Sequence, residues 1–249
     1  PAVGGTKNPR VADVLAQAPD LVLANQEENT QSDLAAIVAA GVPVFVAFPK
    51  RVAEGIAQLA RLARILGVEK DAGVQDLLRR GYHALREAEE ARATRRPLRA
   101  FVPIWMDPLM TIHGDTFISD MMDLAGAQNV FVDRPRRYPL AADLGKAPAL
   151  PAEKIAGRDT RYPRVTAEEL VQRAPEIVLL PDEPHPFTDA DADVFRAMDL
   201  PAARFGTILR CSGKDLCWSG AQSIEGLPRA RAMVYALRDR VPEPTQADA

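Results

Sequence analysis

The sequence predicts a parallel α/β fold built as two similar lobes with a long helix between them. Three observations lead to this prediction. Short apolar runs typical of buried strands alternate with helical patterns along the chain. A stretch without proline carries a long helical pattern, and one helix, turn and strand sequence occurs once on each side of that stretch.

Composition limits the class of protein. The chain has 249 residues, of which 47% are hydrophobic and 26% charged, so it is long enough for one large or two modest globular domains. Its 31 basic and 34 acidic residues leave no excess of positive charge, which argues against a nucleic-acid partner. No apolar run reaches the roughly 18 residues that a transmembrane helix needs.

The strands and helices follow from short local patterns. Apolar or β-branched runs bounded by Pro, Gly, Asn or Asp predict buried strands at 20–24, 42–48, 98–104 and 176–180. Helical patterns predict helices at 11–17, 32–40, 52–66, 115–124, 166–173 and 189–198. This alternation favours a parallel sheet.

A second helical pattern follows at about 68–96, within the stretch between Pro49 and Pro97 that contains no proline. Its apolar face is formed by Val74, Leu78, Tyr82 and Leu85. Such a helix would be about 40 Å long, which is enough to join two lobes. The alternative is two shorter helices broken near Gly81.

An internal repeat supports two related halves. The segment 13–23 matches 169–179 position by position, and each reads as a helix, an Ala-Pro-acid turn and a strand. We therefore expect an N-terminal lobe at 1–66, a connecting helix at 67–97 and a C-terminal lobe at 98–241. Two Arg-Tyr-Pro motifs enclose a predicted surface loop at 138–161, and the polar end, 242–249, is expected to be disordered.

Most catalytic motifs are absent from the sequence. There is no glycine-rich phosphate loop, and no Gly-x-Ser-x-Gly elbow. Two cysteines do not make a structural zinc site, and the three histidines lie far apart in the chain. A dedicated metal cage and a serine hydrolase are therefore not expected.

The two cysteines, Cys211 and Cys217, are separated by a spacer rich in turn-forming residues. A hairpin over 206–220 would place them at disulfide distance. The alternative is two half-buried free thiols.

Two histidines follow predicted strands, where α/β sheets bind ligands. His113 and Asp115 have the residue types of an acid/base pair, although such residues more often form a loop that leads to an Asp helix cap. His185 lies between two prolines, and a stiff loop is the alternative to a role in binding.

Bulky side chains occur where strands end or irregular segments begin. Trp105 and Met106, Tyr162 and Trp218 could together line an aromatic wall for a large, flat or chelated ligand. Ordinary packing in the core is the alternative for each of them.

Several motifs together resemble one family. They are VGGTKNP at 3–9, PDLVLANQEEN at 19–29, DTFI at 115–118, LAG at 124–126, NVF at 129–131 and YPRVTAEEL at 162–170. Their residues and order are similar to those of the cobalamin and ferric-siderophore binding proteins of bacterial ABC importers. The resemblance spans nearly the whole chain.

The resemblance implies two Rossmann-like lobes joined by a long backbone helix, with a metal chelate held between them. It implies a monomeric periplasmic or extracytoplasmic receptor that delivers a corrinoid, ferric siderophore or haem to a membrane permease, with no catalysis and no cofactor of its own. The family's chains begin with a signal segment and a first strand that are not present here, so we expect the sequence to be truncated at its N-terminus.

The family's ligand-facing positions carry over in part. The cobalamin-binding branch has an aromatic residue at the position of Tyr162, and Trp105 and Met106 match a ligand-facing stretch. Other tryptophans of that branch correspond to Thr6 and Asn25, which are polar here. This departure leaves a more polar chelate open.

The resemblance also implies contacts with the permease. Receptors of this type have one glutamate on each lobe that pairs with permease arginines, and Glu168 fits the C-terminal position. The N-terminal position is Ala12, so either the neighbouring Asp13 substitutes or docking is asymmetric.

Two other functions remain as alternatives. A receptor of the same fold for free Zn²⁺ or Mn²⁺ would use His113 and His185 with a carboxylate. An α/β enzyme would use His113 and Asp115 in a cleft.

Overall fold

The computed structural model describes residues 1–243, which fall into two compact units, Pro1–Pro49 and the chain from Lys50 onward. Nearly all of the tail predicted at 242–249 lies outside the described residues. Within the described chain, no helix is both long enough and apolar enough to cross a membrane.

The first unit contains a small parallel sheet of β3 and β4. Its elements are β1 (Gly4–Gly5), β2 (Asn8–Pro9), α1 (Val11–Ala16), β3 (Val22–Asn25), α2 (Gln31–Ala39) and β4 (Val44–Ala47). β1 and β2 pair antiparallel, and β3 pairs with β4 with Leu23 opposite Phe45. Both predicted strands and both predicted helices of this stretch are confirmed.

The second unit is built on a parallel sheet whose order is β10-β9-β5-β8. These strands are β5 (Leu98–Phe101), β8 (Ala127–Asn129), β9 (Ile177–Pro181) and β10 (Ile208–Cys211). The chain adds β8 on one side of β5 and then β9 and β10 on the other. This change of side is where open α/β sheets bind ligands, beyond the carboxyl ends of the strands.

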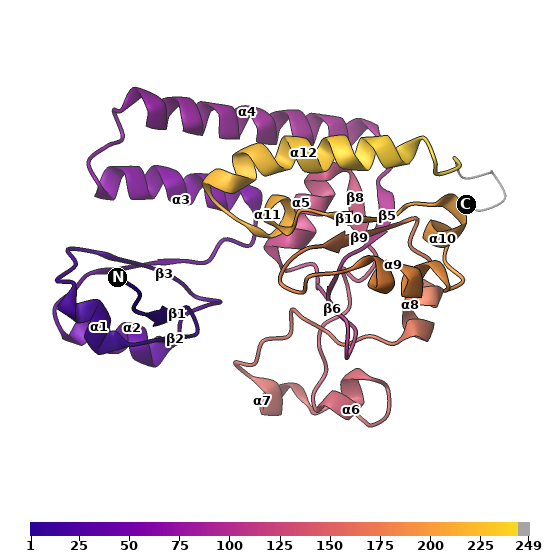
Figure 1. The fold of residues 1–249 in the computed structure, drawn as a ribbon, viewed down its shortest axis with the longest axis horizontal. Helices are drawn as coiled ribbons and strands as arrows, with labels where there is room; N and C mark the ends of the chain where they lie inside the picture. The colour runs from indigo at the N-terminus through magenta and orange to yellow at the C-terminus, as the bar shows by residue number, and fades with distance from the viewer. Residues whose placement is uncertain (244–249) are drawn as a thin grey trace. The chain divides into compact units, whose positions relative to one another are not determined.

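Helices cover both faces of this sheet because the buried strands are apolar on both sides (Figure 1). Along β9, Ile177 and Leu179 point into one core, and Val178 and Leu180 point into the other. The helices of the first core are α3 (Val52–Ile65), α4 (Ala72–Thr94), α5 (Phe117–Ala125), α11 (Gly213–Cys217) and α12 (Ala221–Arg238). The helices of the second core are α8 (Ala167–Arg173), α9 (Asp189–Arg196) and α10 (Pro201–Phe205).

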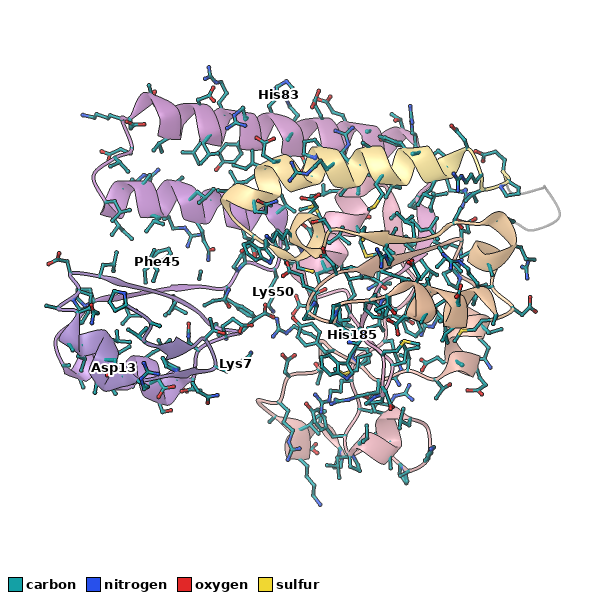
Figure 2. The ribbon with its side chains drawn as sticks, viewed as in Figure 1. Lys7, Asp13, Phe45, Lys50, His83 and His185 are labelled. Carbon is teal, nitrogen blue, oxygen red and sulfur yellow. The ribbon has the colours of Figure 1, made fainter. Side chains whose placement is uncertain are left out.

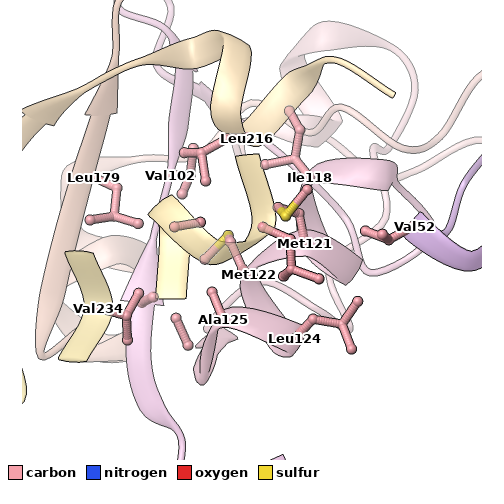
Figure 3. Close-up of a cluster of buried hydrophobic side chains, with 14 of the residues drawn as sticks. Val52, Val102, Ile118, Met121, Met122, Leu124, Ala125, Leu179, Leu216 and Val234 are labelled. Carbon is pink, nitrogen blue, oxygen red and sulfur yellow. The ribbon is translucent and has the colours of Figure 1, made fainter. Parts of the chain in front are cut away.

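The first core is centred on α5. Met121 and Met122 are fully buried there, in one cluster with Leu179 of the sheet and Val234 of α12 (Figure 3). This packing holds the helices of the first core against β5 and β9.

The long helix is continuous, so the alternative of a break near Gly81 is wrong. α4 has 23 residues, a length of about 35 Å, and Gly81 is buried within it. A Cβ atom at Gly81 would lie 3.1 Å from the Ile224 side chain of α12. The glycine therefore permits close packing of two helices.

Several short or irregular elements were not predicted, among them β8 (Ala127–Asn129) and α12 (Ala221–Arg238), and one prediction is wrong. β8 has only three residues, and α12 contains Pro228, so neither has a clear periodic pattern. Residues 206–220 do not form a hairpin, because β10 pairs in parallel with β9 and the chain then enters α11.

Irregular segments connect the remaining elements. β6 (Pro103–Trp105) and β7 (Met110–Thr111) pair antiparallel. The predicted loop 138–161 contains two single-turn helices, α6 (Leu140–Asp143) and α7 (Ala152–Ile155).

Candidate ligand-binding site

Three strands of the large sheet lead at their carboxyl ends to the predicted aromatic and histidine residues. The chain continues from β5 into β6, which ends at Trp105, and β9 leads into the loop with His185. β10 leads through α11 to Trp218. The topology therefore leads these three segments from the same edge of the sheet.

Trp105 and His185 are in direct contact. Their ring centroids are 5.3 Å apart in an edge-on arrangement, and His185 packs in turn against Phe187 at 4.6 Å. Phe187 is buried and anchors the pair, while Trp105 is 46% exposed. The indole Nε1 donates to the carbonyl of Asp107 at 3.0 Å, which fixes the ring orientation. Figure 2 marks His185.

The loop that contains His185 and α11, the helix before Trp218, are joined by hydrogen bonds. The Gly213 amide donates to Asp182 Oδ1 at 2.7 Å, and the Cys217 thiol donates to the Glu183 carbonyl at 3.8 Å. A Cβ at Gly213 would lie 2.8 Å from that carbonyl oxygen. Trp218 follows these two joined segments and is 49% exposed.

Tyr162 lies on a segment that runs beside β7. The His113 amide donates to the Arg161 carbonyl at 2.7 Å, and the Thr111 amide donates to the Pro163 carbonyl at 3.0 Å. The Tyr162 ring is half-buried against the first core, with the Arg161 guanidinium 5.2 Å from its centre. Part of the Tyr162 ring therefore packs on the first core, and part of it stays exposed.

His113 and Asp115 do not form an acid/base pair. His113 Nδ1 accepts a hydrogen bond from the Asp115 amide at 3.1 Å, whereas the Asp115 carboxylate binds Lys50 Nζ at 2.5 Å. Thr116 caps α5 through its hydroxyl. The structure thus agrees with a loop that leads to a helix cap, although the cap is Thr116 and not Asp115.

Met106 is half-buried against the second core, as expected from the packing alternative. Thr6 and Asn25 belong to the first unit. The Thr6 hydroxyl donates to Glu28 at 3.0 Å, and Asn25 Oδ1 accepts from the Glu27 amide at 2.8 Å. These two polar side chains are therefore ordered by neighbours in their own unit.

The histidines do not converge on a metal site. In the part of the chain that the structure describes, no group of three or more His, Cys, Asp or Glu residues is placed to hold a metal ion. The nearest carboxylate to His185 Nε2 is Asp191 at 4.0 Å, and Asp191 is already the partner of the α9 cap. His83 lies on α4 beside a cavity of about 360 Å³ that Glu87 and Glu225 also line (Figure 2). That cavity includes none of the predicted site residues.

The cysteines are free thiols, so the disulfide alternative is wrong. α11 replaces the hairpin that was expected to bring them across from each other. Burial raises the pKa of both the Cys211 and Cys217 thiols to about 12. The reactive thiolate form is therefore scarce near neutral pH, and both thiols lie on the segments that lead to Trp218.

The two predicted docking carboxylates differ in their surroundings. Glu168 lies in the first turn of α8 and is fully exposed; its own backbone N–H and the Thr166 hydroxyl lower the pKa of its carboxyl. Its neighbour Glu169 binds Arg134 Nε at 2.9 Å. Asp13, in the first turn of α1, forms an ion pair with Arg10.

One charged cluster near this site was not predicted from the sequence. Arg134 is 3% exposed and binds both Asp143 and Glu169. The available signal was the run of arginines around the two Arg-Tyr-Pro motifs, which carries much of the chain's positive charge in a short segment.

Comparison with known proteins identifies related molecules. A family model described as periplasmic binding protein matches residues 1–203. A vitamin B12-binding protein of Yersinia pestis (strain Pestoides F) is 26% identical over 168 residues, which are 67% of this chain and 50% of that protein. The chain thus spans about half the length of the curated relatives it matches.

Solved structures share the fold. The periplasmic vitamin B12 binding protein BtuF of Vibrio cholerae has a TM-score of 0.71 at 15% identity, covering 95% of this chain and 82% of that one. The periplasmic haem-binding protein HutB of Vibrio cholerae has a TM-score of 0.69 at 17% identity, covering 94% and 84%. The predicted α/β fold class is confirmed.

Proposed function

The chain belongs to the periplasmic binding protein family, a family of binding proteins and not of enzymes, and from that premise we propose that it captures a metal chelate outside the cytoplasm. The chelate is a corrinoid, a ferric siderophore or haem, and the protein delivers it as a monomer to the permease of an ABC importer. The names of its relatives, which bind vitamin B12 and haem, support this class of ligand.

The observation that carries the proposal is the Trp105–His185 pair at the carboxyl end of the sheet. The Trp105 ring is 46% exposed, is held in one orientation by a hydrogen bond and packs against His185, which in turn packs on the buried Phe187. This ring is ready to receive a flat apolar surface. Macrocycles and aromatic chelates present such a surface. Preorganisation of the ring lowers the ordering cost of binding.

The test is gel filtration of the protein with cyanocobalamin, haemin and ferrichrome in turn, with visible absorbance read in the protein peak. One of the three is expected to co-elute. The same ligand should quench tryptophan fluorescence, because Trp105, one of the two tryptophans of the chain, is the proposed contact.

Variants locate the binding surface. Trp105→Ala is expected to weaken binding by on the order of tenfold, since a desolvated aromatic anchor contributes about 1–2 kcal/mol. Tyr82→Ala is the matched control, because Tyr82 on α4 is similarly exposed, at 48%. Equal losses in both variants would show that the chelate binds elsewhere.

Docking rests on Glu168 in this proposal. Its carboxylate is exposed and its lowered pKa keeps it charged, so it is available to a cationic permease residue. Asp13 is already paired with Arg10, which favours the asymmetric alternative. Glu168→Gln should lower ligand-dependent stimulation of the importer ATPase without changing chelate affinity, and Asp13→Asn should have a smaller effect.

A further inference from the structure

One segment, residues 134–164, carries a strong positive charge and is called the cationic segment below. It has eight basic and three acidic residues, a net charge of +5 in a chain whose net charge is −3. The basic residues are Arg134, Arg136, Arg137, Lys146, Lys154, Arg158, Arg161 and Arg164. Such a concentration favours an anionic partner.

Two of the three acidic residues in the cationic segment are already committed. Asp143 is fully buried and accepts from Arg134, and Asp159 accepts a bidentate pair from Arg161 at 3.0 and 2.6 Å. Asp143 also accepts the amides of Arg137 and Arg164, both at 2.8 Å. These acids hold the backbone of the segment in place and leave its other arginines uncompensated.

Two uncompensated guanidinium groups lie against one aromatic ring. Arg136 is 4.5 Å and Arg158 is 5.1 Å from the centre of the Tyr138 ring. The Tyr138 hydroxyl donates to the Asp159 carbonyl at 2.7 Å, which holds the ring between the two ends of the segment. In the described chain, neither arginine forms an ion pair.

A third guanidinium, that of Arg164, is partly buried and has two nitrogens without a hydrogen-bond partner in the described structure. These nitrogens, Nε and Nη1, are shielded from solvent. Burial, and then the nearby charge of Arg136, lower the pKa of Arg164. Buried donors without acceptors are costly, and an incoming anion would satisfy them.

The cationic segment is joined directly to the aromatic site. Arg164 is opposite Met110 in a β-bridge, and Met110 is opposite Trp105 in the β6–β7 pair. Two steps of about 4.8 Å place the Arg164 and Trp105 backbones roughly 10 Å apart. A single chelate molecule is large enough to reach both.

We propose, building on the proposed function, that the cationic segment binds anionic groups of the chelate through Arg136, Arg158 and Arg164. The ligand is then a chelate with carboxylate or catecholate charge, and a neutral chelate is a poor ligand. Guanidinium groups suit this role because they bind carboxylates in a bidentate manner and stack on aromatic rings. Trp105 receives the flat part of the same molecule.

The experiment measures affinity by tryptophan quenching for paired probes of different charge. Haemin is compared with its dimethyl ester, which has the same ring without free carboxylates, and anionic ferric enterobactin is compared with neutral ferrichrome. We expect the anionic member of at least one pair to bind on the order of tenfold or more tightly. Its affinity should fall as salt rises, and the neutral member's should not.

The variants are Arg136→Gln with Arg158→Gln, and separately Arg164→Gln. Each is expected to remove the preference for the anionic probe while the neutral member keeps its affinity. Arg204→Gln removes the same charge from an exposed arginine of α10 that pairs with Asp199, and it should change neither affinity. Circular dichroism of each variant checks that the fold is kept.

The outcomes separate the two proposals. Equal binding of charged and neutral partners, or a preference that survives both variants, overturns the anionic-chelate inference and leaves the proposed function standing. Failure of every probe and of cyanocobalamin to bind overturns the proposed function, and the inference with it. Two further probes are citrate without iron and vesicles of phosphatidylglycerol. If the same arginines bind citrate while no chelate binds, the cationic segment is a site for a free anion. If they bind the vesicles instead, it is a site for a lipid headgroup.

Discussion

The buried arginine at the start of the cationic segment offers the sharpest test of the fold around the site. Arg134 is 3% exposed and donates to Asp143 Oδ1 at 2.9 Å, to the Asp143 carbonyl at 2.6 Å and to Glu169 Oε1 at 2.9 Å. It thereby connects the cationic segment to α8. Arg134→Met keeps most of the volume and removes every one of these donors.

The expected cost is large because Asp143 cannot regain water. Its side chain is fully buried, and after the substitution it keeps only the two amide donors of Arg137 and Arg164. Removing one partner of a buried ion pair costs about 3–5 kcal/mol. For a chain of this size that is a fall in melting temperature of roughly 6–20 °C.

The assay is urea denaturation followed by circular dichroism, with thermal melting as a second readout. Arg204→Met is the control, since its pair with Asp199 is exposed and should contribute less than about 1 kcal/mol. Adding Asp143→Asn to Arg134→Met should recover part of the loss, because it removes the uncompensated charge. A loss below about 1 kcal/mol for Arg134→Met would show that the buried Asp143 carboxylate does not depend on Arg134.

Three further predictions concern other parts of the second unit. Gly226→Ala should lower the free energy of unfolding by about 1–3 kcal/mol despite better helix propensity, because its Cβ would lie 2.9 Å from the Asp215 carbonyl; unchanged stability in urea would show that α11 and α12 can separate. Burial raises the pKa of the Cys211 and Cys217 thiols to about 12, so both should react slowly with Ellman's reagent at pH 8 in the folded protein. Both should react fast in denaturant, and a count of fewer than two reactive thiols there would indicate a disulfide. Hydrogen bonds from the Thr188 amide, and then from its hydroxyl, lower the pKa of Asp191. This cap therefore stabilises the fold above the pKa that Asp191 has in the unfolded chain, and its contribution is lost as pH falls through the pKa in the folded protein. Thr188→Ala should lower the free energy of unfolding by about 1 kcal/mol at pH 7, and an equal loss in acid would contradict this role of the cap.

The fold was largely readable because its elements carry strong local patterns. The apolar run of β9 and the long amphipathic pattern of α4 both appear in the structure near their expected bounds. The failures have physical causes. β8 is too short to show a period, and α12 contains a proline whose lost hydrogen bond the surrounding packing tolerates.

The site was readable only in part, because spatial neighbours distant in sequence leave no local pattern. Trp105 and His185 were singled out separately, and only the topology of the sheet brings them to 5.3 Å. Cys211 and Cys217 were expected across a hairpin, but the pairing partner of β10 is β9, which lies about 30 residues earlier in the chain. The burial of Arg134 could not be predicted, because it depends on two acidic partners, Asp143 of α6 and Glu169 of α8, that only the fold brings to it.

Equilibrium dialysis of the protein against cyanocobalamin, haemin and ferric enterobactin, with retained metal measured by elemental analysis, shows directly whether the protein binds a metal chelate. We expect one of these chelates to be retained at about one molecule per chain, and Trp105→Ala to reduce the retained amount. Retention of none of them, or equal retention by the variant at every ligand concentration, would contradict it.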